Sequence, residues 1–224
     1  MHLDVCNVSF SYEQSEVLHG VTLRIAEGES CAVLGPSGSG KSTLLHLMAG
    51  ILEPAAGEVR LGDLTVSSRD ASRRAGIRKR HFGFVFQFGD LIPELSLLDN
   101  IVLPALLNGM RRRVADRRAR ELTDSLGIGE VVTRKPREVS GGQMQRAAIA
   151  RSVIHSPDVV IADEPTGSLD SASAAVGLRL LLESCASAGA ALVVATHETS
   201  VAAAMDRQVT ITDGALVDTA GELA

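Results

Sequence analysis

Hydrophobic residues fall into short runs through the first part of the chain, with polar turns between them. Runs rich in β-branched and apolar residues predict strands, here over residues 3–10, 17–25, 30–35, 58–66 and 81–86. Between the third and fourth of these the pattern changes at Lys41, where the letters KSTLLHLMAG predict a helix. Gly50, followed by Pro54, is typical of a helix end. The sequence thus predicts strands interrupted early by one helix.

The rest of the chain alternates between helical and strand patterns. Residues 94–155 are mostly helical in pattern, with breaks at Gly109, around 127–130 and at Pro136. Two short apolar strands are predicted further on, over residues 158–164 and 191–197. A helix is predicted between them, over residues 171–187. This alternation is typical of a parallel α/β sheet. We therefore expect a single domain over 1–224, an α/β core with a helical subdomain inserted at about 88–156, rather than two independent domains.

Composition narrows the class of protein. The chain has 224 residues, and its apolar runs are far shorter than the roughly 18 residues that would span a bilayer. The N-terminus shows no secretory pattern, so a cytoplasmic location is expected. Three widely spaced cysteines, each in apolar surroundings, predict buried, reduced thiols rather than disulfides or a metal site. The net charge of −5 argues against nucleic acid as the main partner.

Arginine is clustered nonetheless, in RRAGIRKRH at 73–81 and RRRVADRRAR at 111–120. Asp116 and Glu121 interleave with the second cluster, as on an ordinary solvated helix face. The alternative is that these clusters lie near anionic headgroups or the acidic loops of a membrane partner. Both interpretations stay open at this point.

One motif predicts a phosphate site directly. The letters GPSGSGKS, residues 35–42, match G-x-x-x-x-G-K-[ST] and lie between a predicted strand and a predicted helix, as a P-loop requires. Its glycines let the backbone wrap closely around phosphate, Lys41 neutralises the β- and γ-phosphates, and the Ser42 hydroxyl is suited to Mg²⁺. The candidate nucleotide-binding residues are Gly35, Pro36, Ser37, Gly38, Ser39, Gly40, Lys41, Ser42 and Thr43.

Two carboxylates follow a buried strand. Asp163 comes after four apolar residues at the carboxyl end of that strand, where ligands gather in open α/β sheets. We expect it to hold Mg²⁺, through water because that ion sheds its waters reluctantly. The neighbouring Glu164 is placed to polarise the water that attacks the γ-phosphate. Without the P-loop such a pair would more simply be a helix cap; with it, the pair predicts a hydrolytic site.

A second Gly-rich turn opens a helix in VSGGQMQRAAIARS, residues 139–152. A helix N-terminus carries unpaired N–H groups and a partial positive charge, so this turn is also suited to an anion. It brings no lysine of its own. The sequence therefore predicts two anion sites, one with a lysine and one without, and a function for this chain has to explain why it carries both.

Taken together, the motifs resemble the nucleotide-binding subunit of ATP-binding cassette (ABC) transporters. The order P-loop, FVFQ, VSGGQ, VVIADEP, GSLD and ATHE covers nearly the whole chain. The resemblance implies a P-loop NTPase core with a mainly parallel sheet, an N-terminal antiparallel β part and an inserted α-helical subdomain. It also implies an enzyme that hydrolyses ATP with Mg²⁺. Val139 departs from the leucine more usual in the family, a small change between apolar residues.

The resemblance assigns roles to residues that would otherwise be unremarkable. Alone, Gln87 is a loop residue, His197 a core or surface histidine and Tyr12 a locally packed aromatic. By resemblance Gln87 touches Mg²⁺ and couples to the membrane partner, His197 contacts the γ-phosphate, Tyr12 stacks on adenine, and Asp170 communicates across a dimer. The expected catalytic residues are thus Lys41, Gln87, Glu164 and His197, and the expected metal-binding residues Ser42, Gln87 and Asp163.

The same resemblance explains the second turn. Two such subunits pack head to tail, so that the P-loop of one and the signature loop of the other, residues 139–143, hold the same ATP. Ser140, Gly141, Gly142 and Gln143 would then serve the partner's nucleotide. The homodimer would work with a separate membrane permease, peripheral on the inner face of the cell membrane, and residues 91–107 would accept the permease's coupling helix unless they are ordinary core and loop.

The details ADEPTGSLD and FQFGDLIPELSLLDNIVLPAL are similar to the lipoprotein-releasing and macrolide-exporter branch. That branch implies export or mechanical transmission across the envelope. The cell-division ATPase and peptide-antibiotic transporters of this branch remain alternatives. A soluble ABC ATPase of DNA repair, translation or cofactor assembly is another, although the chain has neither a long coiled-coil insertion nor a second cassette. A nucleotide sensor without hydrolysis is disfavoured by Glu164 and His197.

Overall fold

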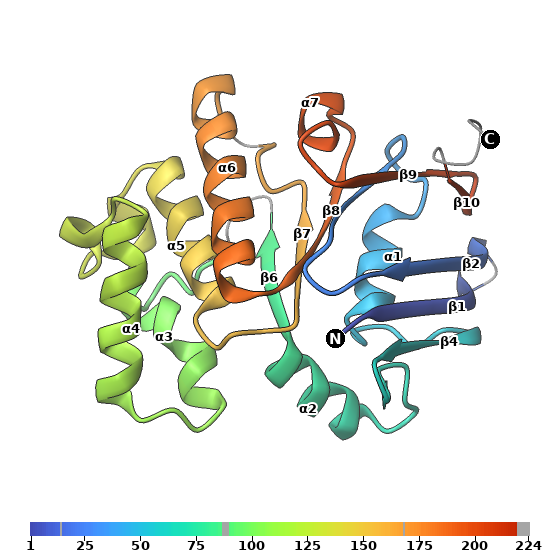
Figure 1. Ribbon diagram of the computed structural model, residues 1–224, viewed down its shortest axis with the longest axis horizontal. Coiled ribbons are helices and arrows are strands. Elements are labelled where there is room, and N and C mark those ends of the chain that lie inside the picture. The colour runs from blue at the N-terminus through green and yellow to red at the C-terminus, as the bar shows by residue number, and fades with distance from the viewer. Residues whose placement is uncertain (14, 87–89, 168, 219–224) are drawn as a thin grey trace. The chain divides into compact units, whose positions relative to one another are not determined.

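Residues 1–13, 15–86, 90–167 and 169–218 are described by the structure, a computed structural model (Figure 1). The chain divides into two units, one made of residues 1–78 with 191–224 and the other of residues 79–190. The division does not test the expected single domain with a helical subdomain at about 88–156, which remains a prediction. No helix among the described residues has both the length and the apolar character needed to cross a bilayer.

The first unit begins with an antiparallel sheet of order β2-β1-β4-β5. Its strands are β1 Leu3–Tyr12, β2 Ser15–Ile25, β4 Ala56–Leu61 and β5 Leu64–Thr65. The single strand predicted over 58–66 is therefore wrong, because Gly62 turns the chain with a φ of 53° and β5 folds back on β4. The antiparallel N-terminal part implied by the resemblance is confirmed.

The prediction that all three cysteines are buried is wrong for Cys6. Cys31 and Cys185 are buried, Cys6 is exposed, and none forms a disulfide. In β1 the side chains of Leu3 and Val5 point inward, so the alternation of a strand turns Cys6 outward. A bulge with Asn7 at a φ of 51° then brings Val8 back to the core.

Parallel strands form the rest of the first unit. β3 Ser30–Leu34 lies between β8 Ala191–Thr196 and β9 Arg207–Thr212, parallel to both, and β10 Ala215–Asp218 runs antiparallel to β9. β8 is buried along its whole length, as expected of an inner parallel strand. The helices here are α1 Lys41–Met48 and α7 Thr199–Ala202. This sheet positions the loop between β3 and α1.

The second unit holds a parallel strand pair and most of the helices. β6 Phe82–Phe86 runs parallel to β7 Val159–Asp163. The helices are α3 Leu97–Leu107, α4 Arg112–Ser125, α5 Gly141–Val153 and α6 Ser171–Ala188, with single 3₁₀ turns at η1 Gly129–Val131 and η2 Pro136–Glu138. The predicted helical stretch and its breaks are confirmed. Helix α2, Ala71–His81, crosses from the first unit into the second, so His81 ends a helix and does not begin a strand.

Candidate functional site

The P-loop leaves the carboxyl end of β3 and leads directly into α1. Lys41 is the first residue of α1, and its side chain is buried. Its Nζ donates hydrogen bonds to the carbonyl oxygens of Gly35 at 2.8 Å and Pro36 at 2.9 Å. The loop therefore curls around its own ammonium group, which holds a positive charge at the N-terminal end of a helix.

Gly40 is a position in this loop where glycine is required. Its φ is 102°, in the range that side chains disfavour. A Cβ atom there would lie 2.8 Å from Leu18 Cδ2 and 3.2 Å from the carbonyl oxygen of Val17. The turn into α1 thus packs against β2 with no space for a side chain.

The P-loop has the donors that a polyphosphate needs. Ser39 is buried, and its Oγ has no hydrogen-bond partner among the described residues. A buried hydroxyl without a partner is costly, so a site that supplies one gains from it. With the Lys41 ammonium and the first N–H groups of α1, the loop fits a multiply charged anion. Pro36, Ser37 and Gly38 complete its turn, and Ser42, exposed, lies in the first turn of α1 beside the buried Thr43.

His197 emerges from the neighbouring strand at the same edge of the sheet. Leu34, the last residue of β3, is paired with Thr196, the last residue of β8. The Thr196 Oγ1 accepts a hydrogen bond from the Glu198 N–H at 3.0 Å, which fixes the turn around His197. The side chain of His197 is exposed. The first unit therefore places the start of the P-loop and His197 at the ends of adjacent strands.

Tyr12 lies at the end of β1, also in the first unit. The residue is 50% exposed, and its ring lies edge-to-face with that of Phe10, with centroids 4.8 Å apart. A half-exposed aromatic ring at a strand end can take a flat partner on its open face.

In the second unit, Asp163 ends β7 and Glu164 begins the turn that follows. Glu164 has a φ of 44°, an uncommon backbone conformation for a residue other than glycine. Asp163 is paired with Phe86, the last residue of β6. Gln87 follows Phe86 in sequence but lies outside the described residues. Within the described ranges, no three His, Cys, Asp or Glu side chains gather as a site for a metal ion.

The signature loop leads into α5 through a capping box. The Ser140 Oγ accepts a hydrogen bond from the Gln143 N–H at 3.3 Å, and the Gln143 Oε1 accepts one from the Ser140 N–H at 2.9 Å. Gly141 and Gly142 follow without side chains, so the first turn of α5 presents bare backbone N–H groups.

This first turn of α5 opens on a pocket of about 470 Å³ within the second unit. Its walls are Gly127, Ser140, Gly141, Gly142, Gln143, Arg146, Leu169, Asp170 and Ser173. Two of the predicted sites therefore meet here, the signature loop and Asp170. The walls include one cation, Arg146, but no lysine.

Asp170 caps the next helix. Its Oδ1 accepts hydrogen bonds from the N–H groups of Ala172 at 3.1 Å and Ser173 at 3.0 Å, at the start of α6. Hydrogen bonds from the Ser173 side chain and backbone lower the pKa of the Asp170 carboxyl. Its carboxylate is thus kept ionised beside the signature loop.

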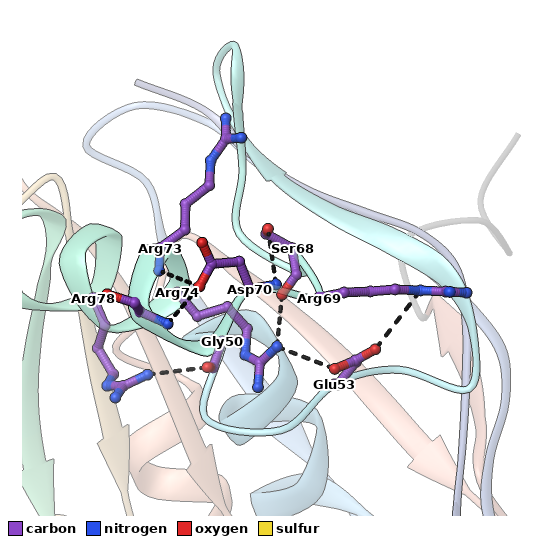
Figure 2. Close-up of polar contacts among 9 residues, drawn as sticks. Gly50, Glu53, Ser68, Arg69, Asp70, Arg73, Arg74 and Arg78 are labelled. Atoms are coloured by element: carbon purple, nitrogen blue, oxygen red, sulfur yellow. Dashed lines mark hydrogen bonds and ion pairs between the residues drawn. The ribbon is translucent and has the colours of Figure 1, made fainter.

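The basic cluster at 73–81 is partly committed to structure. Figure 2 shows Arg74 donating to the Ser68 carbonyl at 2.6 Å and to Glu53 at 3.1 Å, and Arg78 donating to the Gly50 carbonyl at 3.0 Å. Burial, with the nearby charge of Arg74, lowers the pKa of Arg78. These two side chains tie the segment after α1 to α2.

The second cluster, at 111–120, includes similar structural contacts. Arg112 lies 2.7 Å from Asp99 and 2.7 Å from Asp116. Arg118 donates to the Ser156 hydroxyl at 2.6 Å. These contacts give Arg112 and Arg118 a structural role. The possibility that exposed members of both clusters, such as Arg73 (Figure 2), face anionic headgroups or an acidic partner stays a prediction.

Sequence reasoning missed two polar residues of α5 with contacts inside the fold, the buried Gln145 and the half-buried Arg151. Gln145 Nε2 donates to the carbonyl oxygen of Pro165 at 2.5 Å. Arg151 Nη1 donates to the carbonyl oxygen of Asp90 at 2.7 Å, and burial lowers its pKa. One signal was available for Gln145, since it shares the i, i+3, i+4, i+7 face of the helix with residues that are buried, namely Ala148, Ile149 and Ser152.

Comparison with known proteins places the chain in a family. The profile described as "ABC transporter" matches residues 18–167. The chain is 42% identical over 201 residues to the lipoprotein-releasing system ATP-binding protein LolD of Legionella pneumophila (strain Lens), a match that covers 90% of this chain and 88% of the relative. It is 43% identical over 218 residues to LolD of Shewanella sp. (strain MR-4), covering 96% and 94%.

Solved structures of ABC cassettes share the fold of this chain. A dimeric ATP-binding cassette in a post-hydrolysis state, bound to ADP and Pi, superposes with a TM-score of 0.87 at 33% identity, covering 96% of this chain and 98% of that one. A dimeric bacterial ABC transporter cassette gives a TM-score of 0.87 at 35% identity, covering 96% of each. The P-loop NTPase fold expected from the motifs is therefore confirmed. The chain belongs to the ABC transporter family, as an ATP-binding subunit that hydrolyses ATP.

Proposed function

We propose that two copies of this chain form a head-to-tail dimer that drives a separate membrane permease in lipoprotein release. The observation that carries the dimer is the pair of unequal anion sites on one chain. The P-loop has a buried lysine and a buried hydroxyl that has no partner within the described part of the chain, whereas the signature loop offers a capped helix N-terminus and a pocket whose described walls include no lysine. A site of the second kind suits a phosphate whose charge another chain already neutralises.

Within this proposal the P-loop binds the phosphates of ATP. Lys41 would transfer its hydrogen bonds from the carbonyls of Gly35 and Pro36 to phosphate oxygens. Ser39 would gain the partner that its buried hydroxyl lacks. The half-exposed ring of Tyr12 would stack on adenine.

Mg²⁺ would be held by Ser42, Asp163 and Gln87. A hydroxyl, a carboxylate and an amide oxygen are hard ligands of the kind Mg²⁺ prefers, and Mg²⁺ commonly takes its remaining ligands from water and phosphate rather than from a cage of carboxylates. When bound, the ion would neutralise charge that develops on the phosphates.

Glu164 and His197 would carry out the chemical step from the protein side. The Glu164 carboxylate would accept a proton from the attacking water, and His197 would hydrogen-bond to the γ-phosphate. Both lie immediately after buried strands, which fix their backbones. Ser140 and Gly142 would contact the nucleotide of the partner subunit, and Asp170, beside them in the same pocket, would pass the state of that site across the dimer.

The link to lipoproteins rests on the similarity to LolD, whose name assigns it to a lipoprotein-releasing system. Identity of 42–43% over nine tenths or more of the chain makes the same task our proposal here. The subunit would then lie at the cytoplasmic face of the membrane, attached through the permease. Residues 91–107, which include most of α3, would form its docking surface.

Copurification tests this proposal. A tagged Glu164→Gln variant would be expressed in the native cell, trapped with ATP, extracted in mild detergent and its partners identified. We expect a polytopic membrane protein with an extracytoplasmic region suited to lipoprotein substrates. Recovery of the protein alone, or with soluble factors, would favour the soluble ABC ATPase instead. Recovery of a cell-division membrane protein would favour the cell-division ATPase over lipoprotein release.

A further inference from the structure

We infer that Gln145 is a positioning residue for Glu164, linking the signature helix α5 to the turn that carries the proposed catalytic carboxylate. The inference rests on the function proposed above for Glu164. All the residues involved lie in the second unit. The link is a single buried hydrogen bond, from Gln145 Nε2 to the carbonyl oxygen of Pro165, the residue that follows Glu164.

The Gln145 side chain is buried between the Pro165 carbonyl and α6. The residue is 7% exposed. A Cβ atom on Gly177 of α6 would come within 2.8 Å of both Cδ and Nε2 of Gln145, so α6 packs directly on this amide through a position without a side chain. A rigidly packed amide with one fixed acceptor holds that acceptor in place.

The turn after β7 needs such support. Glu164 has a φ of 44°, and uncommon backbone conformations of this kind persist where the surroundings over-determine them. Within the turn, the Gly167 N–H donates to the Glu164 carbonyl at 3.2 Å and the Leu169 N–H to the Thr166 carbonyl at 3.0 Å. The Gln145 side chain anchors this turn to α5, at the peptide next to Glu164.

The same helix begins at the signature loop. Gln145 lies five residues after Ser140, within one continuous helix. Leu169 packs near Gly141, where its Cδ2 would lie 3.5 Å from a Cβ atom. A shift of α5 when the signature loop engages a nucleotide would therefore reach the backbone of Glu164 through Gln145. The expected consequence is that the signature loop of a subunit adjusts the carboxylate of that same subunit.

Steady-state ATP hydrolysis by the full chain tests this. Gln145→Leu keeps the approximate shape and removes the donor, and we expect kcat to fall about tenfold with KM for ATP within about twofold, because only the geometry of Glu164 changes. Thr123→Val is the matched control, since it removes a buried hydrogen bond to a backbone carbonyl in α4 of the same unit. We expect it to leave kcat unchanged.

Gln145→Glu provides a readout that lost packing would not. When ionised, the new carboxylate repels the Pro165 carbonyl; when protonated, its O–H can donate to that oxygen. Burial raises the pKa of such a group, so kcat relative to the wild type should recover as the pH is lowered, while Gln145→Leu should show a flat ratio. If Gln145→Leu does not fold, this profile carries the test alone, and a flat ratio would overturn the inference.

A double-mutant cycle separates the inference from the function beneath it. In a Glu164→Gln background, Gln145→Leu should lower the residual rate by less than about twofold, because the group that it positions is gone. An equal loss in both backgrounds would overturn the inference and leave the proposed function standing. Normal turnover by Glu164→Gln alone would overturn the role of Glu164 itself, and the inference with it.

Discussion

Leu34 and Thr196 face each other at the ends of two parallel strands, β3 and β8, although 161 residues separate them along the chain. Each is the last residue of its strand, so the P-loop and His197 leave the sheet at the same edge. This pairing is what turns two distant motifs into neighbours, as expected of ligand sites at the carboxyl ends of parallel strands.

His197→Ala should therefore slow hydrolysis without preventing ATP binding. The side chain is exposed, so we expect little change in Tm. Loss of a group that stabilises charge in the transition state typically lowers kcat about 100-fold. Turnover measured beside nucleotide binding would show this split, with Glu198→Gln as the neighbouring control. A variant with wild-type kcat would remove His197 from the site.

Glu164→Gln tests the other side of the chemical step. The amide keeps the size of the side chain but cannot take a proton from water, so we expect turnover to fall about 100- to 1000-fold while ATP still binds. Binding without hydrolysis should also trap the closed dimer, visible as an ATP-dependent dimer on size exclusion. A monomer in ATP, or normal turnover, would contradict this role.

Composite sites predict complementation between two inactive variants. Lys41→Met should abolish nucleotide binding, whereas Ser140→Arg should leave binding to the monomer intact and abolish turnover. In a head-to-tail heterodimer one site would carry both defects and the other neither. Mixing equal amounts should therefore restore activity, up to about a quarter of the wild-type value if pairing is random. No recovery on mixing would argue that each chain hydrolyses ATP with its own signature loop.

The local motifs were predictable from sequence because their geometry is local. The letters around Lys41 require a strand, a tight turn and a helix in that order, and β3 and α1 begin and end close to the predicted positions. The capping box at Ser140 is likewise contained within four residues. What sequence missed depends on neighbours distant in the chain. The outward face of Cys6 follows from the packing of Leu3 and Val5, in the same strand, into a core that strands distant in the chain complete.

Gln145 also shows that sequence can mark a residue without predicting its contacts. Its position on the apolar face of a predicted helix marks it as unusual, but its acceptor at Pro165 and the close approach of Gly177 exist only in the folded chain. Buried polar contacts of this kind combine residues from three elements, and no pattern within one element specifies them.

A contact of the same long-range kind gives a prediction on stability. Asp206 Oδ2 accepts hydrogen bonds from the Ser30 N–H at 2.9 Å and the Ser30 hydroxyl at 2.7 Å, which joins the start of β3 to the segment before β9. Those bonds favour the ionised carboxylate, so they lower the pKa of Asp206 below its ordinary value of 3.8.

The sign of the pH dependence follows from that direction. A carboxyl with a lowered pKa in the folded state stabilises the fold above its unfolded pKa, and loses that contribution as the pH falls through the folded value. Asp206 is exposed and water screens its charge, so Asp206→Asn should reduce the free energy of unfolding by less than about 1 kcal/mol at pH 7. The difference from wild type should shrink as the pH falls below about 4. Urea unfolding across this range measures it, with Asp63→Asn, an exposed carboxylate, as the control. A difference that stays constant with pH would show that shape, and not the charge of Asp206, holds this corner of the first unit together.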